Sequence, residues 1–192
     1  MEEFKTWFLI GFDHIFNTQA LDHILFILAL VVIYEFKMLK NIIILVTAFT
    51  IGHSITLALS ALELITYDVK LIEFAIPLTI LITAFNNIIN RNKIKVSTIN
   101  TNYAIALVFG LIHGLGFANY LKAILFKGSI VFELFAFNIG IEVAQIIVVL
   151  IFLSLSAVLS KLMFKKRENW VLFVSSIIFG ISLMLTFNAK FW

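Results

Sequence analysis

The residues best suited to chemistry are histidines and carboxylates that fall inside long apolar stretches. His53, His113 and Glu142 each lie near the middle of a different apolar segment. An ionisable side chain inside hydrocarbon costs about a few kcal/mol, so it normally faces the interior of a helix bundle and has a partner or a function. We therefore expect these three side chains to meet at one depth, where they can bind a divalent metal ion.

A second group of such residues precedes them in the chain. Asp22 and His23 are adjacent near the start of the first apolar segment, and Asp13 and His14 lie shortly before it. We expect Asp22 and His23 to be metal ligands at the mouth of a path to the deeper residues. His14 is predicted to be an interfacial residue on the way in, and not a ligand.

Polar side chains on the apolar segments can orient the metal ligands through hydrogen bonds without contacting the metal themselves. Asn138, Glu142 and Gln145 are spaced i, i+4 and i+7, which places them along one face of a helix. Ser54 directly follows His53, and Asn86 lies in the third apolar segment. Hydrogen bonds from such groups fix the orientation of metal ligands.

Imidazole and carboxylate ligands without thiolate suit nickel, cobalt, zinc or ferrous iron. The Irving–Williams order means that the ligand list alone does not choose among these metals. The chain has no cysteine, which excludes disulfides, thiolate metal sites, iron–sulfur clusters and cysteine nucleophiles. A single buried histidine is often only a hydrogen-bonding residue, so the expectation of a metal rests on the whole set.

The elements that position these residues are membrane helices. The chain is 62% hydrophobic and 13% charged, with a mean hydropathy of +1.09, so a bilayer has to serve as its solvent. Six segments are long enough to cross the hydrocarbon core, which takes roughly 20 residues, at about 19–36, 41–62, 71–90, 103–125, 130–156 and 170–188. An amphipathic helix over residues 4–16 is predicted at the membrane surface. The prediction is an all-α helical bundle that forms one domain over residues 1–192.

The basic residues predict the orientation of this bundle. Alternating crossings place nine of the 14 basic residues on one side: Lys37, Lys40, Arg91, Lys93, Lys95, Lys161, Lys165, Lys166 and Arg167. The other side has Lys5, Lys70, Lys122, Lys127 and Lys190. The positive-inside rule then favours both termini outside the cytoplasm. Because topology accounts for the basic residues, we expect no nucleic-acid partner.

Glycine and proline mark two further positions. Gly110 and Gly114 flank His113 with small-xxx-small spacing, which allows close approach of a neighbouring helix at the level of the histidine. Pro77, the only proline, lies in the third segment, where it is expected to kink the helix and free a backbone carbonyl.

Four stretches of the chain resemble the HupE/UreJ family of small bacterial membrane proteins. They are DHIF to ALDHILFILAL (13–30), FTIGHSITLALSALE (49–63), FGLIHGLGFA (109–118) and FNIGIEVAQ (137–145). The resemblance implies a nickel or cobalt permease in the bacterial cytoplasmic membrane, with motif positions at Asp22, His23, His53, His113 and Glu142. The spacing between His14 and Asp22 and the sequence FNIGIE differ from the best-studied nickel permeases, so the chain resembles a broader branch.

Three functions are consistent with these residues. The favoured one is a permease, in which the metal ion is the substrate. The second is a zinc-dependent intramembrane hydrolase, because three histidines and a carboxylate also describe a catalytic zinc with an open position. The third is an accessory subunit whose polar core only bonds to itself. The expected partners are the lipid bilayer and the metal ion.

Overall fold

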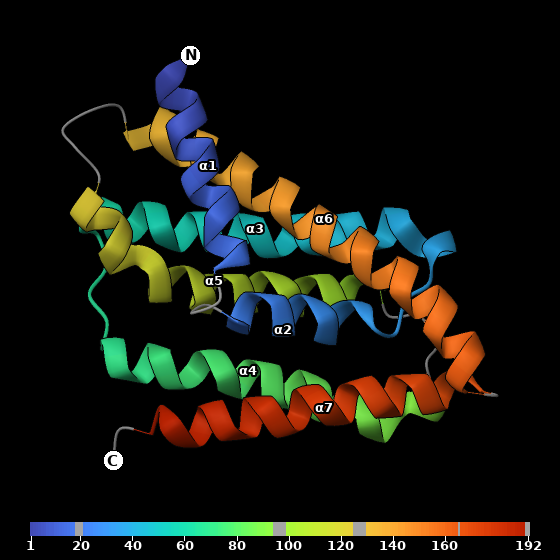
Figure 1. The fold of residues 1–192 in the computed structure, drawn as a ribbon. Coiled ribbons are helices and arrows are strands. Elements are labelled where there is room, and N and C mark those ends of the chain that lie inside the picture. Colours follow the sequence, from blue (N-terminus) through green and yellow to red (C-terminus); the bar gives the residue numbers. More distant parts are fainter. Residues whose placement is uncertain (18–20, 94–98, 125–129, 165, 191–192) are drawn as a thin grey trace.

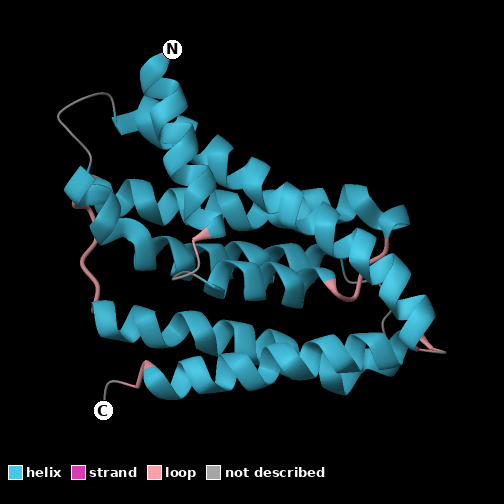
Figure 2. Cartoon of the chain, in the orientation of Figure 1, coloured by secondary structure: helices cyan, strands magenta, loops and turns pink. Residues whose placement is uncertain are grey.

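The regular structure is entirely helical in the part of the chain that is described. The computed structural model describes residues 1–17, 21–93, 99–124, 130–164 and 166–190. The helices are α1 (Glu2–Phe16), α2 (Leu21–Val31), α3 (Leu39–Ala61), α4 (Val69–Asn90), α5 (Ile99–Ile124), α6 (Ile130–Met163) and α7 (Arg167–Asn188), with short 3-10 turns at η2 (Phe36–Met38) and η3 (Arg91–Lys93) (Figures 1 and 2). The predicted all-α architecture is confirmed.

Five helices are long and apolar enough to cross a membrane. They are α4, α6 and α7, most of α5, and α3 together with the η2 turn. They coincide with the last five predicted segments, except that α6 continues to Met163 where the sequence predicted an end near residue 156. The chain is therefore a multi-pass membrane protein. Two predicted segment boundaries, at residues 19 and 125, lie outside the described residues. The same is true of three basic residues, Lys95, Lys127 and Lys165.

The first crossing differs from its prediction as one helix over 19–36. The α2 helix has only 11 residues, which gives a length of roughly 16 Å, about half the thickness of the hydrocarbon core. Helix α1 precedes it at an angle of 72°, and by length and composition the two together form either one broken crossing or a re-entrant loop. The N-terminal helix is thus present as predicted, but its last turn lies inside the bundle, with His14 and Ile15 buried.

Close contact between α1 and α6 accounts for this path. A Cβ atom added at Gly11 would lie 2.0 Å from the carbonyl oxygen of Phe137. One added at Gly140 would lie 2.1 Å from the carbonyl oxygen of Phe8. Real Cβ atoms do not approach so closely, so these glycines let the two backbones touch. The contact holds α1 against the bundle and directs its C-terminal end inward (Figure 1).

A second pair of helices, α3 and α5, is joined in the same way. A Cβ atom at Gly110 would lie 2.1 Å from the carbonyl oxygen of Phe49, and one at Gly52 would lie 2.2 Å from that of Leu107. The close approach that the sequence predicted around His113 is therefore present. It fixes the depth of α3 relative to α5.

The helix ends fall on two sides of the bundle. Helices α2, α4 and α6 end, and α3, α5 and α7 begin, at the right of Figure 1. We name this the basic side, because its described basic residues are Lys37, Lys40, Arg91, Lys93, Lys161, Lys166 and Arg167. Arg167 donates a hydrogen bond to the carbonyl of Val32 at 3.4 Å and another to that of Tyr34. It thereby ties the chain just after α2 to the start of α7.

Candidate metal centre

Three histidines from three helices meet in the interior of the bundle. His14 on α1, His23 on α2 and His53 on α3 each offer one ring nitrogen, and these atoms all lie within 4.8 Å of one another. The ring centroids are 4.5 Å apart for His14 and His23, and about 6 Å apart for the other two pairs. All three side chains are buried. One divalent ion placed among them can contact all three imidazoles.

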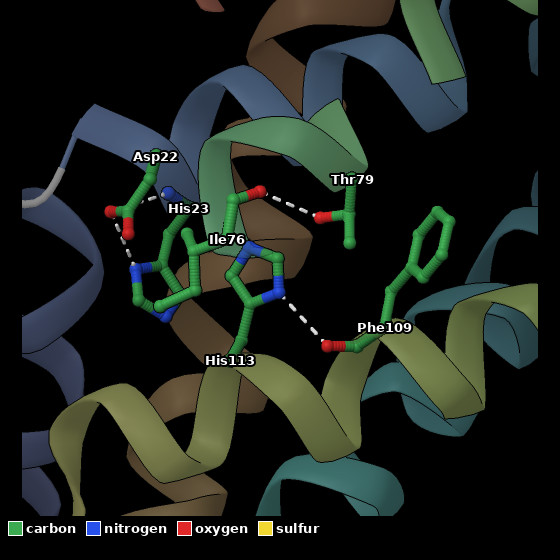
Figure 3. Close-up of polar contacts among 6 residues, drawn as sticks. All are labelled: Asp22, His23, Ile76, Thr79, Phe109 and His113. Carbon is green, nitrogen blue, oxygen red and sulfur yellow. Dashed lines mark hydrogen bonds and ion pairs between the residues drawn. The ribbon is translucent and has the colours of Figure 1, made fainter. Parts of the chain in front are cut away.

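His113 on α5 lies beside this group. Its ring centroid is 5.6 Å from that of His23, and the residue is 1% exposed. Its Nδ1 lies 2.9 Å from the carbonyl oxygen of Phe109, as Figure 3 shows. A carbonyl oxygen only accepts hydrogen bonds, so Nδ1 carries the proton and Nε2 keeps its lone pair. We call the four residues His14, His23, His53 and His113 the histidine centre.

A carboxylate orients His23 in a similar way. The Oδ1 of Asp22 accepts hydrogen bonds from the His23 backbone N–H at 3.0 Å and from His23 Nδ1 at 3.1 Å (Figure 3). Nδ1 is then the protonated nitrogen, and Nε2 is free to bind a metal. A carboxylate behind an imidazole is a common arrangement at protein metal sites, where it fixes the ring and increases its basicity.

The ligand atoms themselves are buried and unpaired. The Nε2 atoms of His14, His23, His53 and His113, and also Nδ1 of His53, have no hydrogen-bond partner among the described residues. Leaving one buried polar atom unsatisfied costs about 1–3 kcal/mol. Several such nitrogens gathered in one place fit a centre that receives a cation.

The close helix contacts place two of these histidines. Gly114 on α5 faces α3, and a Cβ atom there would lie 2.4 Å from the carbonyl oxygen of His53 and 2.2 Å from Oγ1 of Thr56. This contact lies one residue from His113, so it holds His53 and His113 at one level. His14 is in the last turn of α1, one turn beyond Gly11.

Phenylalanine rings surround the histidine centre. The ring of Phe117 is 3.9 Å from that of His14, and the rings of Phe26 and Phe49 are 5.0 and 5.3 Å from that of His113. These residues were not predicted from the sequence as part of the site. A signal was available, because Phe26, Phe49, Phe109 and Phe117 each lie one helical turn from a histidine in the sequence.

A cavity of about 580 Å³ connects the centre with the side of the bundle opposite the basic side. We call it the histidine cavity. Asp22, His14, His23 and His113 line its inner part. Glu73 near the start of α4 and Ala189 just after α7 also line it, and Glu73 is exposed. Pro77 lies in its wall. The cavity thus has two carboxylates in its lining. Glu73 is exposed, and Asp22 lies next to the imidazole of His23.

Glu142, which the sequence placed among the ligands, is not in the group of histidines. Its Oε1 accepts a hydrogen bond of 2.6 Å from the hydroxyl of Thr47 on α3. Thr47 precedes His53 by six residues, or roughly 9 Å along the helix. Its other oxygen, Oε2, is buried and has no partner among the described residues. The predicted depth of Glu142 did not determine which way its side chain points around α6.

The other polar residues predicted to orient ligands bond elsewhere. Asn138 donates to the carbonyl of Leu134 at 2.7 Å, and Ser54 donates to that of Thr50 at 2.6 Å. Gln145 accepts from the hydroxyl of Thr50 at 2.8 Å. Asn86 accepts from Asn90 at 2.7 Å and is exposed. The groups that orient histidines are instead the Asp22 carboxylate and the Phe109 carbonyl.

Comparison with known protein families gives a match over nearly the whole chain. The family described as HupE / UreJ protein matches residues 1–190, a range that includes all seven helices and every residue of the histidine centre. Neither curated proteins nor solved structures gave a match.

Proposed function

The chain belongs to the HupE/UreJ family, and we propose that it is a permease for a divalent transition metal cation. The observation that carries this proposal is the set of three imidazole nitrogens within 4.8 Å of one another, together with the cavity that leads to them. The association of the family with nickel and cobalt transport supports Ni²⁺ or Co²⁺ as the substrate. Imidazole ligands also suit Zn²⁺ and Fe²⁺.

The geometry supports a stepwise path for the cation. Glu73 attracts a hydrated ion to the histidine cavity, and Asp22 adds negative charge next to His23. The free imidazole nitrogens then replace part of the water around the ion. Among the described residues, Asp22 is the one carboxylate in contact with the histidine centre, so a dication is partly neutralised there, and this is compatible with release.

We also propose an orientation in the bacterial cytoplasmic membrane. The basic side faces the cytoplasm, in accordance with the positive-inside rule. The histidine cavity then opens to the outside of the cell. Both chain termini also lie on that side. The cation would enter from there, and the protein would act in uptake.

A zinc-dependent intramembrane hydrolase is the second candidate. Three imidazoles beside a cavity also describe a catalytic zinc with an open position. Such an enzyme also needs a group that transfers protons, and Ser54 and Glu142, which could supply one, bond to Thr50 and Thr47. Of the carboxylates in the described part of the chain, only Asp22 lies next to the histidines, which favours transport over hydrolysis.

Uptake into liposomes tests the proposal. The purified protein is reconstituted, and the entry of Ni²⁺, Co²⁺, Zn²⁺ and Fe²⁺ is followed with an internal indicator. We expect saturable entry that is lost in His23→Ala and His53→Ala and kept in Ser154→Ala, an exposed position on α6. Tightly held metal without entry would favour the hydrolase, and absence of both metal binding and entry would contradict both functions.

A further inference from the structure

A second cavity lies near the basic side, bordered by α2, α3, α4 and α5. Its volume is about 270 Å³, and its polar lining consists of Tyr34, Thr83, Asn86, Asn87 and Asn102. We call it the amide cavity. It has no aspartate, glutamate, lysine, arginine or histidine in its lining. A neutral polar cavity at the end of an apolar bundle needs an explanation, because burying leucine or valine there would cost less free energy than burying amide groups.

The asparagines of the amide cavity are held in a defined orientation. The Nδ2 of Asn87 donates to the carbonyl of Ala29 at 2.7 Å, and the Nδ2 of Asn102 donates to the hydroxyl of Tyr34 at 3.0 Å. The amide nitrogens of Asn87 and Asn102 are therefore engaged with the protein, and their side-chain oxygens remain as acceptors, whereas the oxygen of Asn86 already accepts a hydrogen bond from Asn90 at 2.7 Å. Neutral oxygen acceptors suit a hydrated cation, which they bind more weakly than imidazole binds a transition metal.

The two cavities share three helices, which line them in the same order. On α2, Asp22 and His23 line the histidine cavity, and Ala29 and Leu30 line the amide cavity. On α4, Pro77 lines the first and Thr83 the second. The two cavities therefore lie along one path through the bundle.

The same order holds on α5. His113 lines the histidine cavity, and Phe109 and Asn102 line the amide cavity. The gaps between the two linings correspond to roughly 6–9 Å along the three helices.

Three phenylalanines fill the gap, and we call Phe26, Phe49 and Phe109 the phenylalanine plug. The ring centroid of Phe26 is 5.0 Å from that of Phe49 and 5.5 Å from that of Phe109. Phe26 is 0% and Phe49 is 2% exposed. An apolar constriction excludes a hydrated ion because the ion would have to lose its water there.

Phe109 joins the plug to the histidine centre. Its ring borders the amide cavity, while its carbonyl accepts the hydrogen bond from His113 at 2.9 Å. Figure 3 shows this carbonyl directed at the His113 ring and the phenyl group turned away from it. This hydrogen bond therefore couples the position of the His113 ring to Phe109, which is part of the plug.

We propose that the amide cavity is a second cation site, the exit of the path, and that the phenylalanine plug closes it off from the histidine centre in this structure. This inference rests on the proposed function. A divalent cation that passes the plug exchanges imidazole nitrogens for the oxygens of Asn87 and Asn102. It then leaves to water on the basic side.

Single cysteines test this arrangement, because the natural chain has none. Thr83→Cys places a thiol in the amide cavity, and Leu185→Cys places one in the histidine cavity. Lys161→Cys marks the basic side, and Leu155→Cys marks the exposed apolar surface of α6. Each variant is reconstituted in vesicles and treated with a membrane-impermeant maleimide on one side at a time.

We expect Thr83→Cys to react only from the side that modifies Lys161→Cys, and Leu185→Cys only from the other side. Leu155→Cys stays unmodified. Adding Phe109→Ala to Thr83→Cys opens the plug but keeps the backbone carbonyl that His113 uses. Thr83→Cys then reacts from both sides. Phe85→Ala, an exposed ring outside the plug, is the matched control and leaves the reaction one-sided.

Several results would overturn the inference. One is a Thr83→Cys thiol that reacts from the Leu185→Cys side, or from neither side, in the otherwise natural chain. Another is one-sided reaction that persists in folded Phe109→Ala and in the milder Phe26→Leu. Labelling needs no metal, so it is independent of uptake. Wild-type uptake with an inaccessible Thr83→Cys leaves the permease intact and removes this exit. Correct labelling without uptake leaves the two cavities and the plug as described, but removes the permease and with it the role of the amide cavity as a cation exit.

Discussion

The carboxylate of Asp22 accepts two hydrogen bonds from His23, one from its backbone N–H at 3.0 Å and one from its ring Nδ1 at 3.1 Å. Asp22→Asn keeps the size of the side chain and removes the charge. We expect metal affinity to fall about 10–100-fold, because the imidazole loses a partner that fixes it and increases its basicity. Competition with a metal indicator in detergent measures this. Asp13→Asn, an exposed carboxylate beside His14, is the control, and equal affinities in both variants would argue against His23 as a ligand.

We expect His14 to be required for metal binding and Glu142 not to be required, which is the reverse of the prediction from the sequence. His14→Ala removes one of three clustered nitrogens, so we expect it to lower metal affinity as much as His53→Ala does. Glu142→Gln should leave metal binding in place, because its carboxylate bonds to Thr47. Equilibrium binding separates this effect from any effect on uptake. Loss of binding in Glu142→Gln, with normal binding in His14→Ala, would contradict the assigned centre.

Gly110→Ala tests the contact between α3 and α5. The new Cβ atom would lie 2.1 Å from the Phe49 carbonyl oxygen, so the two backbones have to move apart. We expect the free energy of unfolding to fall by about 1–3 kcal/mol, together with a loss of metal affinity. Thermal unfolding in detergent measures the first effect. Gly180→Ala is the matched control, since nothing lies within 4 Å of a Cβ atom there, and it should be neutral or stabilising. Equal stability of the two variants would show that the contact is looser than described.

The ionisation of Glu35 on the basic side is predicted to make the stability of the fold depend on pH. The hydrogen bond from Lys37 lowers the pKa of the Glu35 carboxyl, partial burial opposes this, and the charge of Arg167 lowers it further. A carboxyl group with a lowered pKa stabilises the fold above its pKa in the unfolded chain, about 4. That contribution is lost as pH falls through the folded pKa.

Thermal unfolding of the wild type and of Glu35→Gln checks this prediction. At pH 7 we expect Glu35→Gln to have the lower melting temperature, and the difference should shrink as pH falls below about 4. Because Glu35 is partly exposed, the effect is small. Glu63→Gln, an exposed loop carboxylate, is the control. A difference that does not change with pH would indicate that the ion pairs are not the cause.

The helices were predictable because each long crossing is an apolar run bounded by charged or polar loops. The same runs placed His53 and His113 near the middle of α3 and α5, and the structure places both rings within 6.0 Å of that of His23. Their proximity follows from segment boundaries and from Gly110 and Gly114. Both signals are present in the sequence.

The positions of His14 and Glu142 were not predictable in the same way. Between α1 and α2 the sequence reads NTQA (17–20), which has neither glycine nor proline, so no residue there signalled the change of direction from α1 to α2. Helix α6 is apolar on most of its surface, and its hydropathy therefore does not show which face Glu142 occupies. Contacts with helices distant in the sequence decided both cases.

The contact of Gly11 with α6 has a consequence for how the chain matures. Helix α1 has 15 residues, roughly 22 Å, which is too short to be anchored across a bilayer on its own. The backbone that receives it belongs to the sixth helix to leave the ribosome. His14 therefore reaches its place only after most of the protein has been inserted. A nascent chain that stops before α6 has the other three histidines but not the assembled centre, so the capacity to capture metal arises late in biosynthesis.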